Sequence, residues 1–298
     1  MDLLNVQYLP TSRYASRNPN LRPEQSTDYN ILDLYLPESA VPSTPLIVFI
    51  HGGAWQSSKP GNFTAVCSAL RQRGVGVAAV GYRLSTRSPG EKVSPVRSPA
   101  HSQDVGAGVA WLLAATQFGG DSEAAKALNK WNPSSFFVVG HSGTSQFATI
   151  PASVWMPKLQ GYIGVEGIYN IPLIAKTFPS YSEWFLTGSF GLQDDPNNNE
   201  WITGSPSLVK QFNPPLISSP FRAPHLVIHS QEDELVDVAQ SKEWYDHLCS
   251  FRASLPSVEQ EEWTLEYEVT KLGGKHDDIL CSDPFYDYVI SWIKKRNL

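Results

Sequence analysis

The chain has 298 residues, of which 41% are hydrophobic and 17% charged. This balance predicts a folded protein with a substantial core and argues against an intrinsically disordered chain. The formal net charge of −6, without a Lys/Arg cluster, argues against a nucleic-acid partner, because a phosphate backbone requires a basic surface.

The beginning of the chain lacks the basic and apolar regions of a signal peptide, and no apolar run reaches the length of a membrane-spanning helix. The three cysteines, Cys67, Cys249 and Cys281, are too few and too scattered for a disulfide framework or a zinc cluster. We therefore expect reduced, buried thiols in a cytoplasmic protein that has no membrane partner.

Strand patterns alternate with helical patterns along the chain. Residues 29–36 alternate apolar with polar or aromatic side chains, which is typical of a strand with one solvent-exposed face. Further strands are predicted at residues 46–50, 75–80, 136–139, 162–165, 225–228 and 263–269. Helices are predicted at residues 63–73, 104–115 and 285–293. This alternation predicts one α/β domain over residues 1–298, with a mostly parallel sheet and helices on both of its faces.

Residues 170–220 interrupt the alternation and are dense in Pro, Gly, Asn and aromatic residues. Their aromatic side chains, including Tyr181, Trp184, Phe185 and Phe190, are too apolar for a free linker. We interpret the segment as a small helical cap insertion over the carboxyl edge of the sheet. A core helix hairpin that contacts no ligand is the alternative.

The run Gly140-His141-Ser142-Gly143-Thr144 follows the predicted strand at 136–139. A strand that ends in Gly-x-Ser-x-small and turns at once into a helix is typical of a nucleophile elbow. Such an elbow exposes the serine hydroxyl above a helix N-terminus. Thr144 stands where the pattern has Gly, and a polar turn between a strand and a helix is the alternative. The assignment of Ser142 as a nucleophile therefore depends on the rest of the site.

A glycine-containing loop, His51-Gly52-Gly53-Ala54-Trp55, follows the predicted strand at 46–50. In serine hydrolases the amides of such a loop bind the developing oxyanion, together with the amide that follows the nucleophile. We therefore expect Gly52, Gly53 and Ala54, with Gly143, to form an oxyanion hole. We expect His51 to orient this loop rather than to act as a base.

An acid and a base follow the last two predicted strands. Asp233 lies one tight turn beyond the strand at 225–228, and His276 lies in a glycine-bracketed loop after the strand at 263–269. The chain order Ser142, Asp233, His276 is the order expected of an α/β-hydrolase fold with a Ser-His-Asp triad. Glu166, at the end of the preceding strand, is the rival acid. The other histidines lack metal-ligand spacing and no phosphate-binding loop follows a strand, so we expect no metal and no cofactor.

Together these motifs resemble the fungal kynurenine formamidases, which are α/β-hydrolases of the esterase/lipase superfamily. The segments that carry the resemblance are His51 to Trp55, Tyr82-Arg83-Leu84, Gly140-His141-Ser142, Glu166-Gly167-Ile168-Tyr169, His229-Ser230 with Asp233-Glu234-Leu235, and His276-Asp277-Asp278. The resemblance runs from about residue 31 to the C-terminus. It implies removal of the formyl group of N-formylkynurenine in tryptophan catabolism, with Ser142 as nucleophile, Asp233 as acid and His276 as base. Thr144 and Asn170 depart from the family pattern near the pocket, so the substrate could differ.

The aromatic residues near these motifs suggest the kind of substrate. Trp55 and Tyr169, with Trp184 or Phe185 from the insertion, could form an aromatic wall for an aryl group, although ordinary core packing is the alternative. We therefore expect a small-molecule aromatic amide or ester as the partner. The open alternatives are a carboxylesterase or lactonase of fungal specialised metabolism and a non-catalytic hydrolase-fold binding protein. The sequence leaves the oligomeric state open, with a homodimer among the alternatives.

Overall fold

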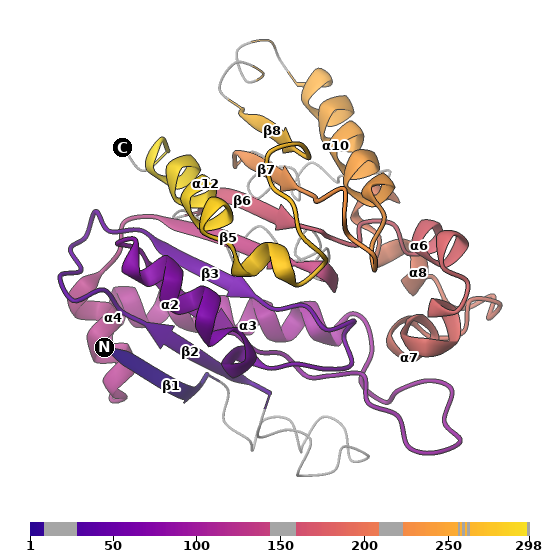
Figure 1. Ribbon diagram of the computed structural model, residues 1–298. Helices are drawn as coiled ribbons and strands as arrows, with labels where there is room; N and C mark the ends of the chain where they lie inside the picture. Colours follow the sequence, from indigo (N-terminus) through magenta and orange to yellow (C-terminus); the bar gives the residue numbers. More distant parts are fainter. Residues whose placement is uncertain are drawn as a thin grey trace.

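The computed structural model describes residues 1–8, 29–143, 159–208, 223–255, 257, 260 and 263–296. Within this part of the chain, eight strands form one sheet in the order β1-β2-β4-β3-β5-β6-β7-β8 (Figure 1). In chain order the strands are β1 (Asp2–Gln7), β2 (Ile31–Tyr35), β3 (Leu46–Ile50), β4 (Gly76–Val80), β5 (Phe136–His141), β6 (Leu159–Val165), β7 (His225–Ile228) and β8 (Leu265–Glu268). The β1–β2 and β2–β4 pairs are antiparallel, whereas all other neighbouring strands of the sheet pair in parallel. The predicted mostly parallel sheet is confirmed.

The central strands are buried along their whole length because both faces of the sheet are covered. Every residue of β3 and β5 is buried, as expected for continuous apolar runs in a parallel sheet. Their register pairs Ile50 with Gly140, and the register of β5 with β6 pairs His141 with Val165. The chain therefore leaves β3, β5 and β6 at the same edge of the sheet, which is where ligands bind in this type of architecture.

Helices cover both faces of the sheet, as predicted. The long helices are α2 (Thr64–Gln72), α3 (Ala100–Phe118), α4 (Glu123–Trp131), α10 (Val238–Ala253) and α12 (Asp283–Lys294). Side chains of α2 and α12 pack with Phe49 and Val139 on one face, and side chains of α3 and α4 pack with Val48 and Val138 on the other. Trp244 of α10 packs on Val227, whose neighbours in β7 face the α12 side. Hence α10 lies on the same face as α3 and α4.

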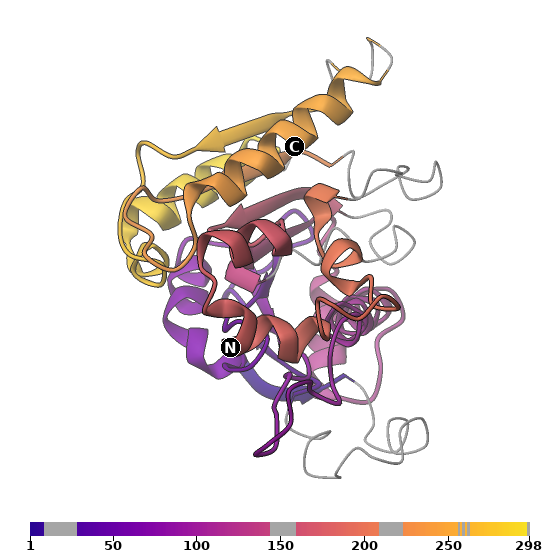
Figure 2. The same cartoon turned by 90° about the vertical axis from the view of Figure 1, so that its right-hand side faces the viewer.

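The chain segment that connects β6 to β7 forms short helices, which lie beyond the carboxyl ends of the parallel strands (Figures 1 and 2). They are α6 (Ile171–Thr177), the π-helix η4 (Ser182–Leu186), α7 (Thr187–Phe190), α8 (Glu200–Thr203) and the 3₁₀ helix η5 (Pro206–Leu208). Phe185 and Phe190 are buried and belong to the main core cluster, so this segment is packed onto the domain. The rest of the predicted insertion, residues 209–220, lies outside the described residues.

Some elements differ from the sequence-based prediction. The edge strand β1 was not predicted, because most of its residues are exposed and its apolar side chains do not alternate. Helices α4 and α10 were also not predicted, and α3 is longer at both ends than the predicted 104–115. All three cysteines are free, but only Cys67 is buried and Cys281 is exposed, so the expectation of buried thiols was wrong for Cys281. In the described part of the chain, no helix combines the length and the apolar character needed to cross a bilayer.

Candidate active site

Ser142 directly follows β5 and has a φ of +60°, in the left-handed region that residues with a side chain rarely adopt. Strained conformations of this kind concentrate at functional sites, and a strained serine between a strand and a helix is typical of a nucleophile elbow. The Gly52 backbone passes so close that a Cβ there would lie 2.7 Å from the Cβ of Ser142. Only glycine therefore fits at position 52. Thr144 and the predicted helix start beyond Gly143 lie outside the described residues.

The loop after β3 curls tightly beside Ser142. Gly53, Ala54 and Trp55 have φ values of +116°, +52° and +58°. The backbone N–H groups of Gln56 and Ser57 both donate to the Gly53 carbonyl, at 3.0 Å each. Gly53 and Ala54 line the same cavity as Ser142.

The N–H groups of Ala54 and Gly143 donate to no other residue among those that the structure describes. Ala54 lies in the loop after β3 and Gly143 directly follows Ser142. Unused amides at these two positions are what an oxyanion hole requires. The role of Gly52, Gly53, Ala54 and Gly143 stays a prediction.

Two aromatic side chains hold this loop from behind. Trp55 is 1% exposed, packs edge-on against Phe190 at 4.8 Å and underlies Gly143, where an added Cβ would lie 3.0 Å from the Trp55 ring. The ring of His51 stacks on Tyr82 at 4.5 Å and donates from Nδ1 to the Gly52 carbonyl at 2.8 Å. Burial lowers the pKa of His51 to about 4, so this ring is neutral. These contacts agree with an orienting role for His51.

Asp233 and His276 meet across the carboxyl edge of the sheet. The Nδ1–H group of His276 donates to Oδ2 of Asp233 at 2.8 Å, and His276 lines the cavity together with Ser142. The other carboxylate oxygen, Oδ1, accepts from the N–H groups of Leu235 and Val236 at 2.9 Å each. Burial opposes ionisation of Asp233, but the hydrogen bonds from His229, His276 and the Val236 amide outweigh it and hold its pKa well below the usual range. Asp233 is therefore a carboxylate aimed at the imidazole.

Glu166, the rival acid, lies next to this pair without replacing it. Its side chain is fully buried and its backbone has a φ of +50°. Its Oε1 accepts from the Ser230 N–H group at 3.3 Å, whereas Oε2 has no hydrogen-bond partner among the described residues and lies 3.6 Å from Nδ1 of His276. Burial and the negative charge of Asp233 raise the pKa of Glu166 to about 10. Glu166 is thus a neutral carboxylic acid at neutral pH, and the geometry favours Asp233 as the partner of His276.

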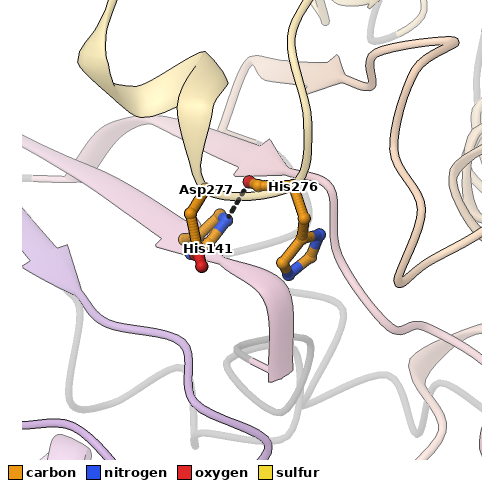
Figure 3. Close-up of side chains that lie close together, drawn as sticks. All are labelled: His141, His276 and Asp277. Carbon is orange, nitrogen blue, oxygen red and sulfur yellow. Dashed lines mark hydrogen bonds between the residues drawn. The ribbon is translucent and has the colours of Figure 1, made fainter.

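Two histidines that the sequence analysis left without a role support this arrangement. His141 donates from Nε2 to the backbone carbonyl of His276 at 3.0 Å, and the two rings lie 4.8 Å apart (Figure 3). Burial and the neighbouring His276 lower the pKa of His141 to about 3. His229 lies with Nε2 3.3 Å from Oδ2 of Asp233 and bonds Ser241 through Nδ1. In the sequence, only their positions could have indicated this role, because His141 precedes Ser142 and His229 directly follows β7.

A cavity of about 220 Å³ lies over Ser142 and His276. Trp184 and Phe185 line it, and so does Tyr181, whose hydroxyl donates to the Leu235 carbonyl at 2.9 Å. Substrate binding by Trp184 and Phe185 stays a prediction. From its sequence context, Tyr181 was expected only to be an apolar residue of the insertion. The outer wall of the cavity is therefore aromatic.

Tyr169 does not line this cavity. Its ring stacks on Trp244 at 5.4 Å and is 1% exposed. The Tyr169 side chain packs directly against Gly164 and Gly167. An added Cβ would lie 2.1 Å from this side chain at Gly164 and 2.4 Å from it at Gly167. Together with Trp55, Tyr169 belongs to the packing behind the cavity, contrary to the expected aromatic wall.

Among the described residues there are two groups of side chains that could hold a metal ion, and within each group the possible ligand atoms lie within 4.8 Å of one another. One comprises His141, His276 and Asp277, and the other comprises Glu166, Asp233 and His276. Both share His276, whose Nδ1 bonds Asp233, and the Nε2 atom of His141 is used by a backbone carbonyl. A metal ion in either group would have to displace hydrogen bonds that build the site.

Known hydrolases are similar to this chain in sequence and in fold. The BD-FAE family model matches residues 32–154. The kynurenine formamidase-like hydrolase fscH of Fusarium equiseti is 25% identical over 292 residues, which is 88% of each chain. The kynurenine formamidase avaC of Aspergillus versicolor is 26% identical over 303 residues, 90% of this chain and 97% of that protein. The structure of carboxyl esterase 2 from Tuber melanosporum superposes with a TM-score of 0.60 at 18% identity, over 90% of this chain and 83% of that one.

Proposed function

We propose that this hydrolase, an α/β-hydrolase of the esterase and formamidase-like type, uses Ser142 as nucleophile, His276 as general base and acid, and Asp233 as the carboxylate that orients His276. One observation carries the proposal: the 2.8 Å hydrogen bond from His276 to Asp233, at a cavity that both Ser142 and His276 line. With Nδ1–H donated to Asp233, the Nε2 atom of His276 is left as the acceptor for the serine proton.

The reaction would proceed in two acyl-transfer steps. His276 takes the proton of Ser142 as the hydroxyl oxygen attacks the acyl carbon, and the amides of Ala54 or Gly53 and of Gly143 stabilise the oxyanion. His276 then protonates the departing amine or alcohol. Water, deprotonated by the same His276, releases the acyl group and regenerates Ser142.

The substrate that we propose is N-formyl-L-kynurenine or a related aryl formamide, which places the enzyme in tryptophan catabolism in the cytoplasm. The names of the two fungal relatives support this choice. The cavity supports it too, because Tyr181, Trp184 and Phe185 provide an aromatic wall for an aryl leaving group. The small volume of the cavity suits a small acyl group.

A carboxylesterase or lactonase is the second candidate. The cavity lining consists mainly of apolar side chains and small Ser, Gly and Ala residues, which recognise an aryl group without distinguishing an amide from an ester linkage. A panel that compares N-formylkynurenine with aryl and alkyl esters by kcat/KM separates the two candidates.

The proposed nucleophile is tested by Ser142→Ala. We expect this variant to lose turnover of every substrate in the panel and to lose labelling by a serine-directed phosphonate. Ser57→Ala is the matched control, because Ser57 lines the same cavity and its hydroxyl donates to the Gly53 carbonyl. Phosphonate labelling of Ser142→Ala equal to that of the unmodified protein would refute the assignment. A folded protein that neither reacts with the phosphonate nor turns over any substrate would instead be a binding protein.

A further inference from the structure

We propose that a second cavity, next to the catalytic one, binds a substrate arm that carries a cationic group, and that Asp277 selects this charge. The second cavity measures about 420 Å³ and lies against α2 and the 3₁₀ helix η7 (Asp278–Cys281). This inference rests on the proposed function and narrows its substrate class. For the zwitterionic arm of N-formyl-L-kynurenine, it directs the α-ammonium group, and not the α-carboxylate, toward Asp277.

The two cavities share one wall. Ser58, Phe63 and Asp277 line both of them, so the two cavities adjoin at these three residues, and an arm of a molecule in the catalytic cavity would enter the second cavity there. Phe63 is held in place by stacking on His51 at 5.7 Å and by contact with Phe49 at 5.4 Å. An aromatic ring in a shared wall suits a cationic arm, because the face of the ring attracts positive charge.

Apart from the shared wall, the lining of the second cavity is mainly apolar. Ala65 and Val66 of α2 and Leu280 of η7 line it, together with the Asn62 side chain. These side chains would cover the hydrocarbon part of an arm, while a polar end group stays at the shared wall.

Asp277 supplies the charge at this wall. It is exposed, and it makes no hydrogen bond or ion pair with any residue in the part of the chain that the structure describes. Its carboxylate lies beside the ring of His141, and the three groups of Asp277, His141 and His276 approach within 4.8 Å (Figure 3). A cationic group bound to Asp277 would therefore lie close to the reacting centre.

The printed sequence places no positive side chain among the described residues of the two cavity linings. Among the described residues that line the two cavities there is no Lys or Arg, and the ring of His141 is neutral because burial lowers its pKa. Glu234 adds negative charge nearby, since its Oε2 accepts from the His276 N–H group at 3.2 Å. An anionic arm would find a carboxylate and no counter-ion at the wall. The charges thus favour an ammonium over a neutral group and a neutral group over a carboxylate.

The test uses two series of substrates, formanilides and phenyl acetates. Within each series the ring carries the same short chain, which ends in a primary ammonium, a methyl or a carboxylate group. We expect kcat/KM to be about fivefold higher for the ammonium than for the methyl compound, the upper range for one exposed ion pair. The preference should shrink as the ionic strength rises, because salt screens exposed charges.

Two variants locate the effect. Asp277→Asn should abolish the charge preference, whereas Asp278→Asn should retain it, because Asp278 is an exposed neighbour that lines neither cavity. Ala65→Trp, which fills the second cavity, should lower kcat/KM for substrates whose chain is long enough to enter this cavity, relative to kcat/KM for substrates with a shorter chain. Equal kcat/KM for the three end groups, or a charge preference that survives Asp277→Asn, would overturn the inference and leave the hydrolase assignment intact. Failure to turn over the methyl compound in both series would refute the proposed function and this inference together.

Discussion

Replacing Glu166 by Gln should make the protein more stable, and the gain should grow with pH. Glu166 is a fully buried carboxyl group, one oxygen of which has no hydrogen-bond partner in the described part of the chain, and its pKa is raised from 4.5 to about 10. In the unfolded chain the carboxyl group ionises near pH 4.5, whereas in the folded protein it keeps its proton up to about pH 10. Between these values the native state binds one more proton than the unfolded state, so stability is lost as pH rises.

The size of the effect follows from the linkage slope. One bound proton corresponds to a change of about 1.4 kcal/mol in unfolding free energy per pH unit. Between pH 5.5 and 7.5 the wild-type protein should lose about 3 kcal/mol through Glu166 alone. Glu166→Gln has no such loss, because the amide does not titrate. Its shape matches the neutral carboxylic acid, so kcat/KM at pH 7 should stay within the same order of magnitude.

Urea denaturation at half-unit steps from pH 5.5 to 7.5 measures the difference between variant and wild type. Glu183→Gln is the control, because Glu183 is exposed and its replacement leaves the buried Glu166, and with it the loss of stability at rising pH, in place. A difference for Glu166→Gln that stays constant or falls with rising pH would refute the neutral state of this carboxyl group.

Three further predictions concern the proposed acid, a buried ion pair and the aromatic wall. Asp233→Asn should lower kcat by about 10⁴, because His276 loses the partner that fixes its tautomer. Asp104→Asn should lower the unfolding free energy by about 3 kcal/mol in urea denaturation, because Asp104 is fully buried and binds Arg83 Nε and Nη2 at 2.7 and 2.8 Å. Trp184→Ala should raise KM for aryl substrates by about two- to tenfold and leave KM for alkyl esters unchanged, because the lost contact is with the aryl ring.

Matched variants decide each of these cases. If Glu166→Gln lost as much activity as is expected of Asp233→Asn, while the Asp233 variant stayed active, the acid would be misassigned. Asp194→Asn removes an exposed carboxylate, and a loss of stability equal to that of the Asp104 variant would contradict the role of burial. Phe118→Ala removes an exposed ring outside the cavity lining, so a KM change equal to that of the Trp184 variant would point to a general effect.

Local pattern was enough to predict where the proposed catalytic residues lie relative to the strands. Ser142, Asp233 and His276 each follow a strand, and parallel pairing brings the ends of these strands to one edge of the sheet. A continuous apolar run specifies a buried strand by itself, which is why β3 and β5 were predicted within two residues. Glycine at position 52 is required because the loop after β3 passes close to Ser142, where a larger residue would clash.

Properties that depend on long-range packing were not predictable in this way. The unpaired oxygen of Glu166 results from its position between His276 and His141, on three separate segments of the chain. Tyr169 and Tyr181 are both aromatic residues near the site, but only packing on Trp244 separates the first from the cavity. Periodicity carries no information on which of two such rings faces a ligand.

Hydrogen bonds join the wall of the cavity to the loop that holds the proposed oxyanion amides. Gln56, in the turn closed on Gly53, donates to the Trp184 carbonyl at 3.1 Å, and Arg87 donates to the carbonyls of both Glu183 and Trp184. A displacement of the Trp184 backbone would break the Gln56 bond, which ties this turn to the wall. A substrate that is bulky enough to displace the wall would therefore also disturb the turn that holds the proposed oxyanion amides. We expect such a substrate to react slowly.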